Sequence, residues 1–199
     1  MKSFWTAFFL IFVAELGDKT QFMTLALSSR YRATVVLLGV TIGTMLVSLV
    51  SVGLGEMLGG VLPRAPMNIG AGIIFMIFAA LSLKEAFEEK NTEEEKAKEE
   101  IAKDIDHPRH LWLTIAFTFF IAELADKTML ATVAIASRDK NYFAIWLGST
   151  LGLVVSSCMV IVVGKALSTK ITGKSMHITT AVIFLVAGLL SIGQGITQH

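Results

Sequence analysis

Two copies of one charged string stand inside long apolar stretches of this sequence. The first copy, Glu-Leu-Gly-Asp-Lys-Thr, occupies residues 15–20, and the second, Glu-Leu-Ala-Asp-Lys-Thr, occupies residues 123–128, which is 108 positions later. Charged side chains in the middle of a membrane-length apolar segment are costly, and they usually mark an ion pathway or a binding site. The sequence therefore predicts one functional site that is built from both strings.

The candidate ligand atoms of the two copies are all oxygens. The predicted cation ligands are Glu15, Asp18, Thr20, Gln21, Glu123, Asp126 and Thr128. The Glu and Asp of each copy are three residues apart, so on a continuous helix they would share a face. Neither apolar segment contains a histidine, and an oxygen-only set suits hard divalent cations such as Ca²⁺, Mg²⁺ or Mn²⁺ rather than zinc or copper.

The charges of the two copies balance around one divalent cation. Four ionised carboxylates carry −4, and Lys19 with Lys127 contributes +2, which leaves −2. Without a cation, mutual repulsion and burial favour the protonated carboxyl groups, so metal and protons would occupy the site alternately. Each lysine could pair with a carboxylate or lead toward solvent, and Ser48 and Ser157 could support the site by lining the path.

A purely structural alternative is an inert ion-paired cluster that locks two helices together. Buried ion pairs are weak sources of stability and need nearly complete compensation. A duplicated cluster of this kind would bring little structural benefit. The pattern therefore favours a transport pathway over a structural lock.

The composition is that of an integral membrane protein. The chain has 199 residues, of which 54% are hydrophobic, and its mean hydropathy is +0.68. Ten of its 16 acids lie between Glu85 and Asp106, and four of the remaining six belong to the two motifs. A net charge of +1 argues against a nucleic-acid partner, and the single Cys158 excludes an intrachain disulfide and multi-cysteine metal sites. No cofactor is expected.

Six segments are long and apolar enough to cross a bilayer, which takes about 20 residues. They cover residues 4–28, 34–58, 67–87, 111–136, 143–167 and 176–196. The predicted fold is all-α, with a first three-helix repeat over residues 1–87, an acidic loop over 88–110 and a second three-helix repeat over 111–199. His177, at the start of the last segment, is expected to face the membrane interface.

The two halves repeat each other beyond the motifs. Leu38-Gly39 matches Leu147-Gly148 and Gly43 matches Gly152, so both halves carry a Gly-xxx-Gly pattern that predicts close helix packing. Because each unit has three spans, the second copy must enter from the opposite face of the membrane. Inverted repeats of this kind are a transporter architecture with the site near the midplane.

The distribution of basic residues predicts the orientation. One side carries Lys2, Arg64, Arg138 and Lys140. The other carries Arg30, Arg32, six basic residues from Lys84 to Arg109, Lys165, Lys170 and Lys174. Four basic residues on one side against eleven on the other place the central loop in the cytoplasm and both termini outside. The loop itself reads as a solvated helix with Glu–Lys pairs four residues apart.

The doubled motif resembles that of the Gdt-type cation/proton exchangers, a six-helix family marked by two copies of Glu-x-Gly-Asp-(Lys/Arg)-(Ser/Thr). Both copies match, except that Ala125 stands where the family pattern has the glycine found at Gly17. The chain is similar to bacterial members of the Mne-type manganese exporters. This resemblance implies export of Mn²⁺, with Ca²⁺ as the other candidate, in exchange for protons across the bacterial inner membrane.

The leading hypothesis is therefore a secondary transporter whose partners are a divalent cation, protons and the lipid bilayer. The alternative is a channel or uniporter that uses the same carboxylates and only dissipates a gradient. An intramembrane enzyme is not expected, because neither a nucleophile–base arrangement nor a metal-binding histidine pair supports it. A structural membrane protein would tolerate Glu15→Gln without any ion phenotype.

Overall fold

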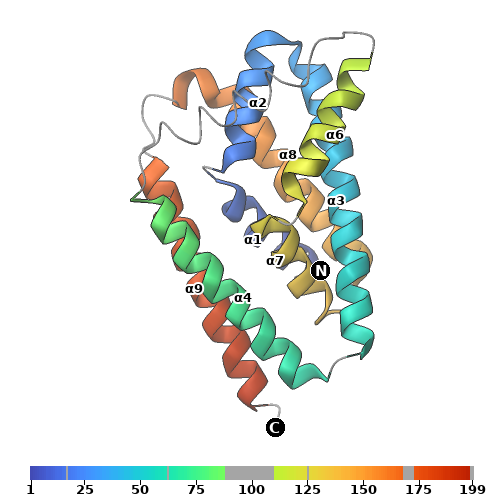
Figure 1. Ribbon diagram of the computed structural model, residues 1–199, viewed down its shortest axis with the longest axis vertical. Coiled ribbons are helices and arrows are strands. Elements are labelled where there is room, and N and C mark those ends of the chain that lie inside the picture. The colour runs from blue at the N-terminus through green and yellow to red at the C-terminus, as the bar shows by residue number, and fades with distance from the viewer. Residues whose placement is uncertain (17, 62, 88–109, 125, 168–172, 198–199) are drawn as a thin grey trace.

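The computed structural model describes residues 1–16, 18–61, 63–87, 110–124, 126–167 and 173–197, and its regular elements within these ranges are helices. The helices are α1 (Lys2–Glu15), α2 (Lys19–Arg30), α3 (Ala33–Val61), α4 (Arg64–Glu85), α6 (Leu111–Glu123), α7 (Lys127–Ala136), α8 (Tyr142–Leu167) and α9 (Gly173–Thr197). Figure 1 shows them as one elongated bundle. The acidic loop predicted over residues 88–110 lies outside the described residues except for His110.

Four of the described helices are long and apolar enough to cross a membrane. They cover Ala33–Val61, Ala65–Glu85, Tyr142–Val162 and His177–Thr197. Each of the two segments that carry a motif is divided into two shorter helices. α1 and α2 have 14 and 12 residues, and α6 and α7 have 13 and 10 residues. The all-α fold is confirmed among the described residues and is compatible with a membrane protein, whereas the segments over residues 4–28 and 111–136 are each interrupted at the motif.

The helices break at the same place in both motifs. α1 ends at Glu15, and Leu16 is extended with φ −65° and ψ 116°. α6 ends at Glu123, and Leu124 is extended with φ −63° and ψ 125°. The acid pair of each copy therefore does not share a helix face as predicted, because the two acids flank a break.

The second half of each break also follows from the motif. Asp18 and Asp126 precede α2 and α7 with nearly identical extended backbones, at φ −76° and ψ 164° or 166°. Aspartate is among the preferred residues at this position before a helix, although neither of these two described side chains accepts a capping hydrogen bond. Since the second copy has Ala125 in place of Gly17, the break does not require a glycine.

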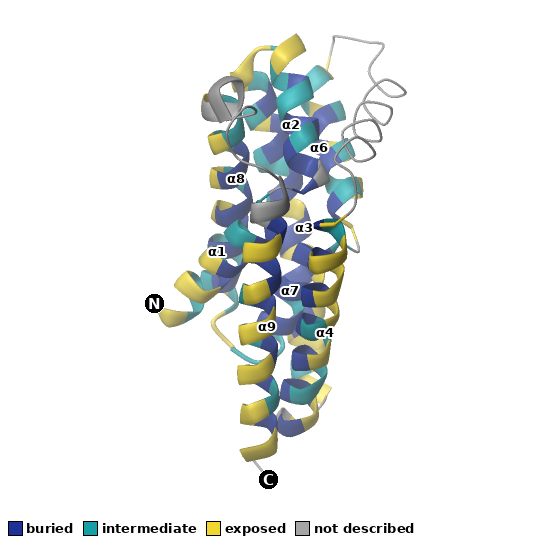
Figure 2. Ribbon diagram, turned by 90° about the vertical axis from the view of Figure 1, so that its left-hand side faces the viewer, coloured by how far each residue is buried: buried dark blue, intermediate teal, exposed yellow. Residues whose placement is uncertain are grey.

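The long helices pack in three pairs of segments (Figure 1). α3 lies along α6 and α7, α8 lies along α1 and α2, and α4 lies along α9. In Figure 2 the outward faces of α4 and α9 are exposed while their shared face is buried. Among the described residues, the larger buried apolar cluster draws on α1, α3, α4, α7, α8 and α9, and a second one joins α2, α3 and α6.

Glycines on α3 permit its close approach to α6. A Cβ atom at Gly39 would lie 2.7 Å from the Ile115 side chain, and one at Gly43 would lie 2.6 Å from the Ala116 carbonyl oxygen. The residue numbers of the contacting positions rise together along the two helices, so α3 and α6 run parallel.

Glycines on α8 make the matching contacts with α1. A Cβ atom at Gly148 would lie 2.5 Å from the Phe4 carbonyl oxygen, and one at Gly152 would lie 2.9 Å from that of Phe8. Phe8 and Ala116, the contacts of Gly152 and Gly43, are 108 positions apart. The prediction of close packing at both Gly-xxx-Gly patterns is confirmed, and each half supplies the same surface to the other.

The third pair, α4 and α9, runs antiparallel. Gly72 and Gly188 approach each other so closely that a Cβ atom on Gly188 would lie 3.0 Å from the Gly72 carbonyl oxygen. Phe184 stacks on Phe75 with ring centroids 6.0 Å apart and lies 5.5 Å from the Phe78 ring. These aromatic contacts fix how the two helices lie against each other.

We expect Gly43→Ala to destabilise the protein, because the new methyl group would collide with the α6 backbone. Overpacking of this kind costs about 1–3 kcal/mol. Gly53→Ala on the same helix is the matched control, since no atom lies within 4 Å of a Cβ atom there, and alanine favours a helix over glycine. Thermal unfolding in detergent measures the difference. Equal melting temperatures for the two variants would contradict the packing argument.

Candidate cation site

The four motif carboxylates gather at the two helix breaks. Glu15 and Glu123 are the last residues of α1 and α6, and each is only 1% exposed. Asp18 is 7% exposed, and Asp126 is partly buried. The Glu15 carboxylate is within electrostatic range of the other three acids and is repelled by them. The two copies are thus brought to one place, as the sequence predicts.

A threonine hydroxyl spans each break. Thr20 Oγ1 donates a hydrogen bond to Glu15 Oε1, and Thr128 Oγ1 donates to Glu123 Oε2 at 2.6 Å. Each threonine stands in the first turn of the second helix, while each glutamate ends the first helix. The hydroxyl therefore holds the glutamate in place and ties the two half-helices together.

Lys127 joins the two copies by an ion pair. Its Nζ lies 2.6 Å from Asp18 Oδ1, and both side chains are buried. The expectation that a motif lysine pairs with a carboxylate is confirmed for Lys127, and the carboxylate belongs to the other copy. The Lys19 side chain lies outside the described part of the structure.

The helix ends add their own field to the site. The carbonyl ends of α1 and α6 carry partial negative charge, and the amide ends of α2 and α7 carry partial positive charge. A cation between the breaks would be favoured by the first pair, whereas the second pair stabilises the carboxylates of Asp18 and Asp126. Discontinuous helices form ion sites in transporters in this way.

Polar side chains of α3 and α8 lie near the motif helices. Gln21 Nε2 donates a hydrogen bond to Ser156 Oγ at 2.5 Å. Ser48 and Ser157, the predicted supporting residues, are 2% and 4% exposed. Ser51 instead donates to the carbonyl of Val47 in its own helix, at 2.7 Å. Gln21 thus connects the first motif to α8.

Several buried oxygens keep free coordination capacity. Within the described residues, Glu15 Oε2, Asp18 Oδ2 and Ser48 Oγ are buried without a hydrogen-bond partner. Such orphaned acceptors are rare in proteins and call for an explanation such as an ion or water. The described side chains do not, however, contain three or more Asp, Glu, His or Cys already arranged as a metal shell. The acids are near one another but would have to move closer to share one ion.

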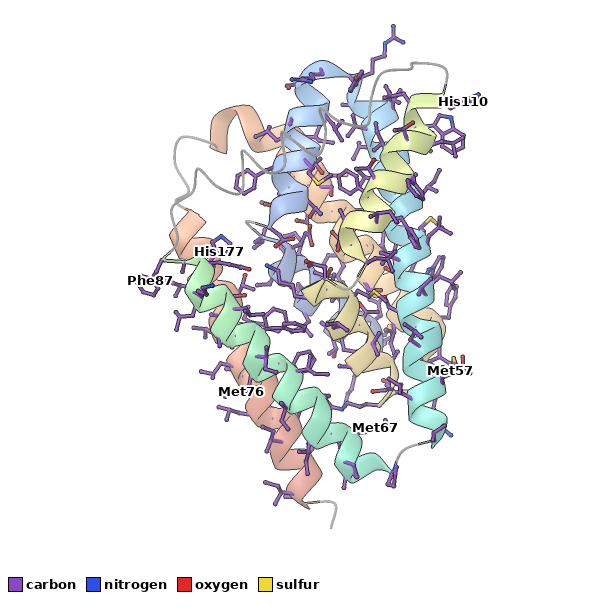
Figure 3. All side chains as sticks on the ribbon, viewed as in Figure 1. Met57, Met67, Met76, Phe87, His110 and His177 are labelled. Carbon is purple, nitrogen blue, oxygen red and sulfur yellow. The ribbon has the colours of Figure 1, made fainter. Side chains whose placement is uncertain are left out.

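Two functional candidates were not predicted from the sequence. Glu85 is the last residue of α4, and its Oε2 lies 3.4 Å from Lys127 Nζ. His177 Nδ1 lies 3.3 Å from the same oxygen, and Figure 3 shows His177 beside the end of α4 marked by Phe87. His177 is 8% exposed, so the expectation that it faces the membrane interface is wrong. The contact depends on the pairing of α4 with α9, which no local pattern reveals.

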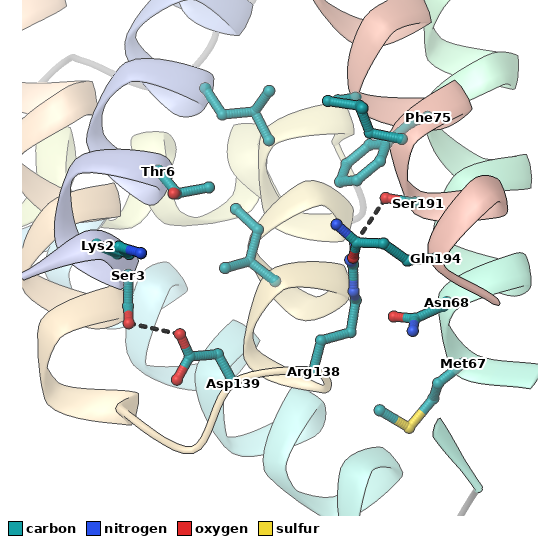
Figure 4. Close-up of a pocket in the computed structure, with 14 residues that line it drawn as sticks. Lys2, Ser3, Thr6, Met67, Asn68, Phe75, Arg138, Asp139, Ser191 and Gln194 are labelled. Carbon is teal, nitrogen blue, oxygen red and sulfur yellow. Dashed lines mark hydrogen bonds between the residues drawn. The ribbon is translucent and has the colours of Figure 1, made fainter. Parts of the chain in front are cut away.

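A separate cavity of about 400 Å³ lies at the far end of α7. Arg138 donates hydrogen bonds of 2.6 Å to Ser191 Oγ and to Gln194 Oε1, and Ser3 Oγ donates to Asp139 at 2.5 Å (Figure 4). No described residue of the doubled motif lines this cavity. Since α7 has ten residues, about 15 Å of helix separates the cavity from the acids.

Comparison with known proteins gives a consistent result along the chain. Residues 3–90 and 111–199 match the family described as Divalent cation/proton antiporter GDT1. GDT1-like protein sll0615 of Synechocystis is 29% identical over 201 residues, which cover 96% of this chain and 97% of that protein. The chloroplastic PAM71-homolog of Arabidopsis thaliana is 32% identical over 93% of this chain, and the chloroplastic GDT1-like protein 2 of Oryza sativa is 31% identical over 93%.

The chain spans 57% and 59% of the length of these two chloroplast relatives. No solved structure matches it.

We expect Thr128→Val to destabilise the protein by about 1–3 kcal/mol, because the buried Glu123 carboxylate loses a hydrogen bond. Thr128→Ser keeps the donor and should retain stability. Thr118→Val on α6 is the control, since Thr118 Oγ1 has no hydrogen-bond partner among the described residues. Melting temperatures in detergent test this, and an equal loss in Thr118→Val and Thr128→Val would refute a special role for the Thr128 hydroxyl.

Proposed function

Because the chain belongs to the GDT1 family of divalent cation/proton antiporters, we propose that it exports a divalent cation, Mn²⁺ before Ca²⁺, from the cytoplasm in exchange for protons. The family is one of transporters rather than enzymes. The observation that carries the proposal is the meeting of four buried or partly buried carboxylates from both motif copies at paired helix breaks.

The proposed ligands combine side chains from both breaks. They are Glu15, Asp18, Thr20, Gln21, Glu123, Asp126 and Thr128, with Lys19, Lys127, Ser48 and Ser157 in support. Glu15 Oε2 and Asp18 Oδ2, which have no hydrogen-bond partner among the described residues, are the first candidates to coordinate a cation. Binding requires the four acids to close around the ion, which relieves their mutual repulsion. An oxygen shell of this kind fits Mn²⁺ and Ca²⁺, and Mn²⁺ is preferred on the resemblance to the manganese exporters.

Exchange follows from the same repulsion. Four carboxylates in an apolar bundle can be neutralised by a divalent cation or by protons. A cation that binds displaces protons, and protons that bind displace the cation. The site is then occupied by one or the other, which couples the two flows.

The packing supports six membrane crossings in two inverted repeats. In this proposal α1 with α2 forms one broken span, and α6 with α7 forms another. The parallel contacts of α3 with α6 and of α8 with α1 are those expected if a two-fold axis in the membrane plane relates the halves. Matching positions, such as Gly43 and Gly152, make matching contacts.

The exit route is the cavity beyond α7. It is lined by Lys2 and Arg138, two of the basic residues that the sequence assigns to the outer side. In a bacterial inner membrane the central loop would then be cytoplasmic and both termini outside, and the cation would pass from the acids toward this cavity.

Flux measurements in reconstituted vesicles test the proposal. With an imposed pH gradient, we expect Mn²⁺ to accumulate against its own gradient, with Ca²⁺ and Mg²⁺ compared under the same conditions. Glu123→Gln, Asp18→Asn and Asp126→Asn should each abolish accumulation, because each removes a carboxylate from the site. Glu56→Gln, at an exposed acid of α3, should transport normally.

Size-exclusion profiles of the variants confirm that they are folded. If Mn²⁺ only equilibrates whatever the pH gradient, the protein is a channel or uniporter. Normal transport by both Asp18→Asn and Asp126→Asn would overturn the assignment of the site.

A further inference from the structure

A line of alternating charges leads away from the acid site. Lys127 Nζ lies 2.6 Å from Asp18 Oδ1 and 3.4 Å from Glu85 Oε2, and His177 Nδ1 lies 3.3 Å from that same Glu85 oxygen. The four side chains come from the start of α2, the start of α7, the end of α4 and the first turns of α9. They are therefore brought together only by the folded bundle.

Among the described residues of this line, Lys127 alone cannot balance both carboxylates. The Lys127 side chain is 8% exposed and that of His177 is 10% exposed, while Glu85 keeps 26%. Buried charges need partners, and one ammonium group between two carboxylates neutralises only one of them. When Lys127 pairs with Asp18, a proton on His177 can neutralise Glu85.

We propose that Glu85 and His177 form a proton-binding pair whose protonation is controlled, through Lys127, by the cation at the acid site. The inference rests on the proposed function and adds the group that holds the exchanged proton. A cation at Asp18 repels the Lys127 ammonium and shifts it toward Glu85. With Glu85 neutralised by Lys127, His177 releases its proton to water.

The reverse step restores the starting charges. When the cation leaves, Lys127 returns to Asp18, and Glu85 again stabilises a proton on His177. Within the Glu85–His177 pair one proton moves, between His177 and solvent, in addition to any protons on the motif carboxylates, so the charges of the pair and Lys127 balance in each state. Because linkage is reciprocal, a cation that expels the proton must itself bind more weakly when the proton is present.

Among the residues that the structure describes, the other charged groups near His177 do not change this result. From α4, Glu85 is in contact and the neighbouring Lys84 is exposed. From α7, Lys127 lies behind Glu85. From α1, the Val13 carbonyl accepts a hydrogen bond from Thr180, and the nearby Glu15 is held by its own threonine.

The repeat supports a special role for this end of the bundle. The offset of 109 between the third helices of the two halves places Gln194 at the position of Glu85 and Asn68 at that of His177. Both counterparts line the cavity at the opposite end. They have similar shapes but do not titrate, so only one end carries a proton-binding pair. That end adjoins the loop predicted to be cytoplasmic, where a proton should leave as the cation enters.

Calorimetric titration of the detergent-solubilised chain with Mn²⁺ at pH 6 and pH 8 tests the inference. Wild-type protein should bind more weakly at pH 6. His177→Gln removes one competing proton, so it should bind Mn²⁺ more tightly than wild type at pH 6. At pH 8 the two should be equal. His110→Gln, at an exposed histidine, should match wild type at both pH values.

Glu85→Gln gives a second and opposite signal. It removes the alternative partner of Lys127, so Mn²⁺ should bind more weakly than to wild type at both pH values. A purely structural role of His177 would weaken binding equally at both pH values in His177→Gln, which would overturn the inference. So would an unchanged ratio of the pH 6 and pH 8 affinities. Absence of Mn²⁺ binding by wild type at either pH would overturn the proposed function as well.

Discussion

Repulsion among four acids inside an apolar bundle is the constraint on which the rest of this structure depends. Carboxylates in such surroundings need hydrogen bonds, counter-charges or a bound cation. The protein supplies the first two through threonine hydroxyls at each break and through Lys127 at Asp18. It leaves buried oxygens of Glu15 and Asp18 without such partners among the described residues. A cation would complete what the side chains leave incomplete.

The bundle around the acids has to hold broken helices rigidly. A helix break exposes backbone groups that lipid cannot satisfy, so both breaks must be enclosed by other helices. α3 and α8 do this by lying directly against α6 and α1, which their glycines permit. The close contacts at Gly43 and Gly152 are therefore part of the site, although neither residue is polar.

The sequence predicted much of this arrangement, and the remainder depends on tertiary contacts. Apolar length, the doubled motif and the matching glycines predicted the membrane character, the gathering of the acids and the close packing. Gly17 permits a departure from a regular helix in the first copy, whereas Leu124 and Ala125 favour a helix in the second copy, so the sequence does not predict both breaks. Glu85 was grouped with the acids of the loop, and His177 was placed at the interface, because only the antiparallel contact of α4 with α9 brings them together.

The near-identity of the two motifs raises the question of how such a site could distinguish the two sides of a membrane. Matching residues in inverted repeats make equivalent contacts, so a fully symmetric chain would bind its ion equally well from either face. The asymmetry must therefore come from positions where the halves differ. The halves differ where Gln194 corresponds to Glu85 and where Asn68 corresponds to His177. The Glu85–His177 pair and the Gln194–Asn68 pair lie at opposite ends of α4 and α9. A charge difference there biases proton binding toward one face while the cation ligands remain common to both.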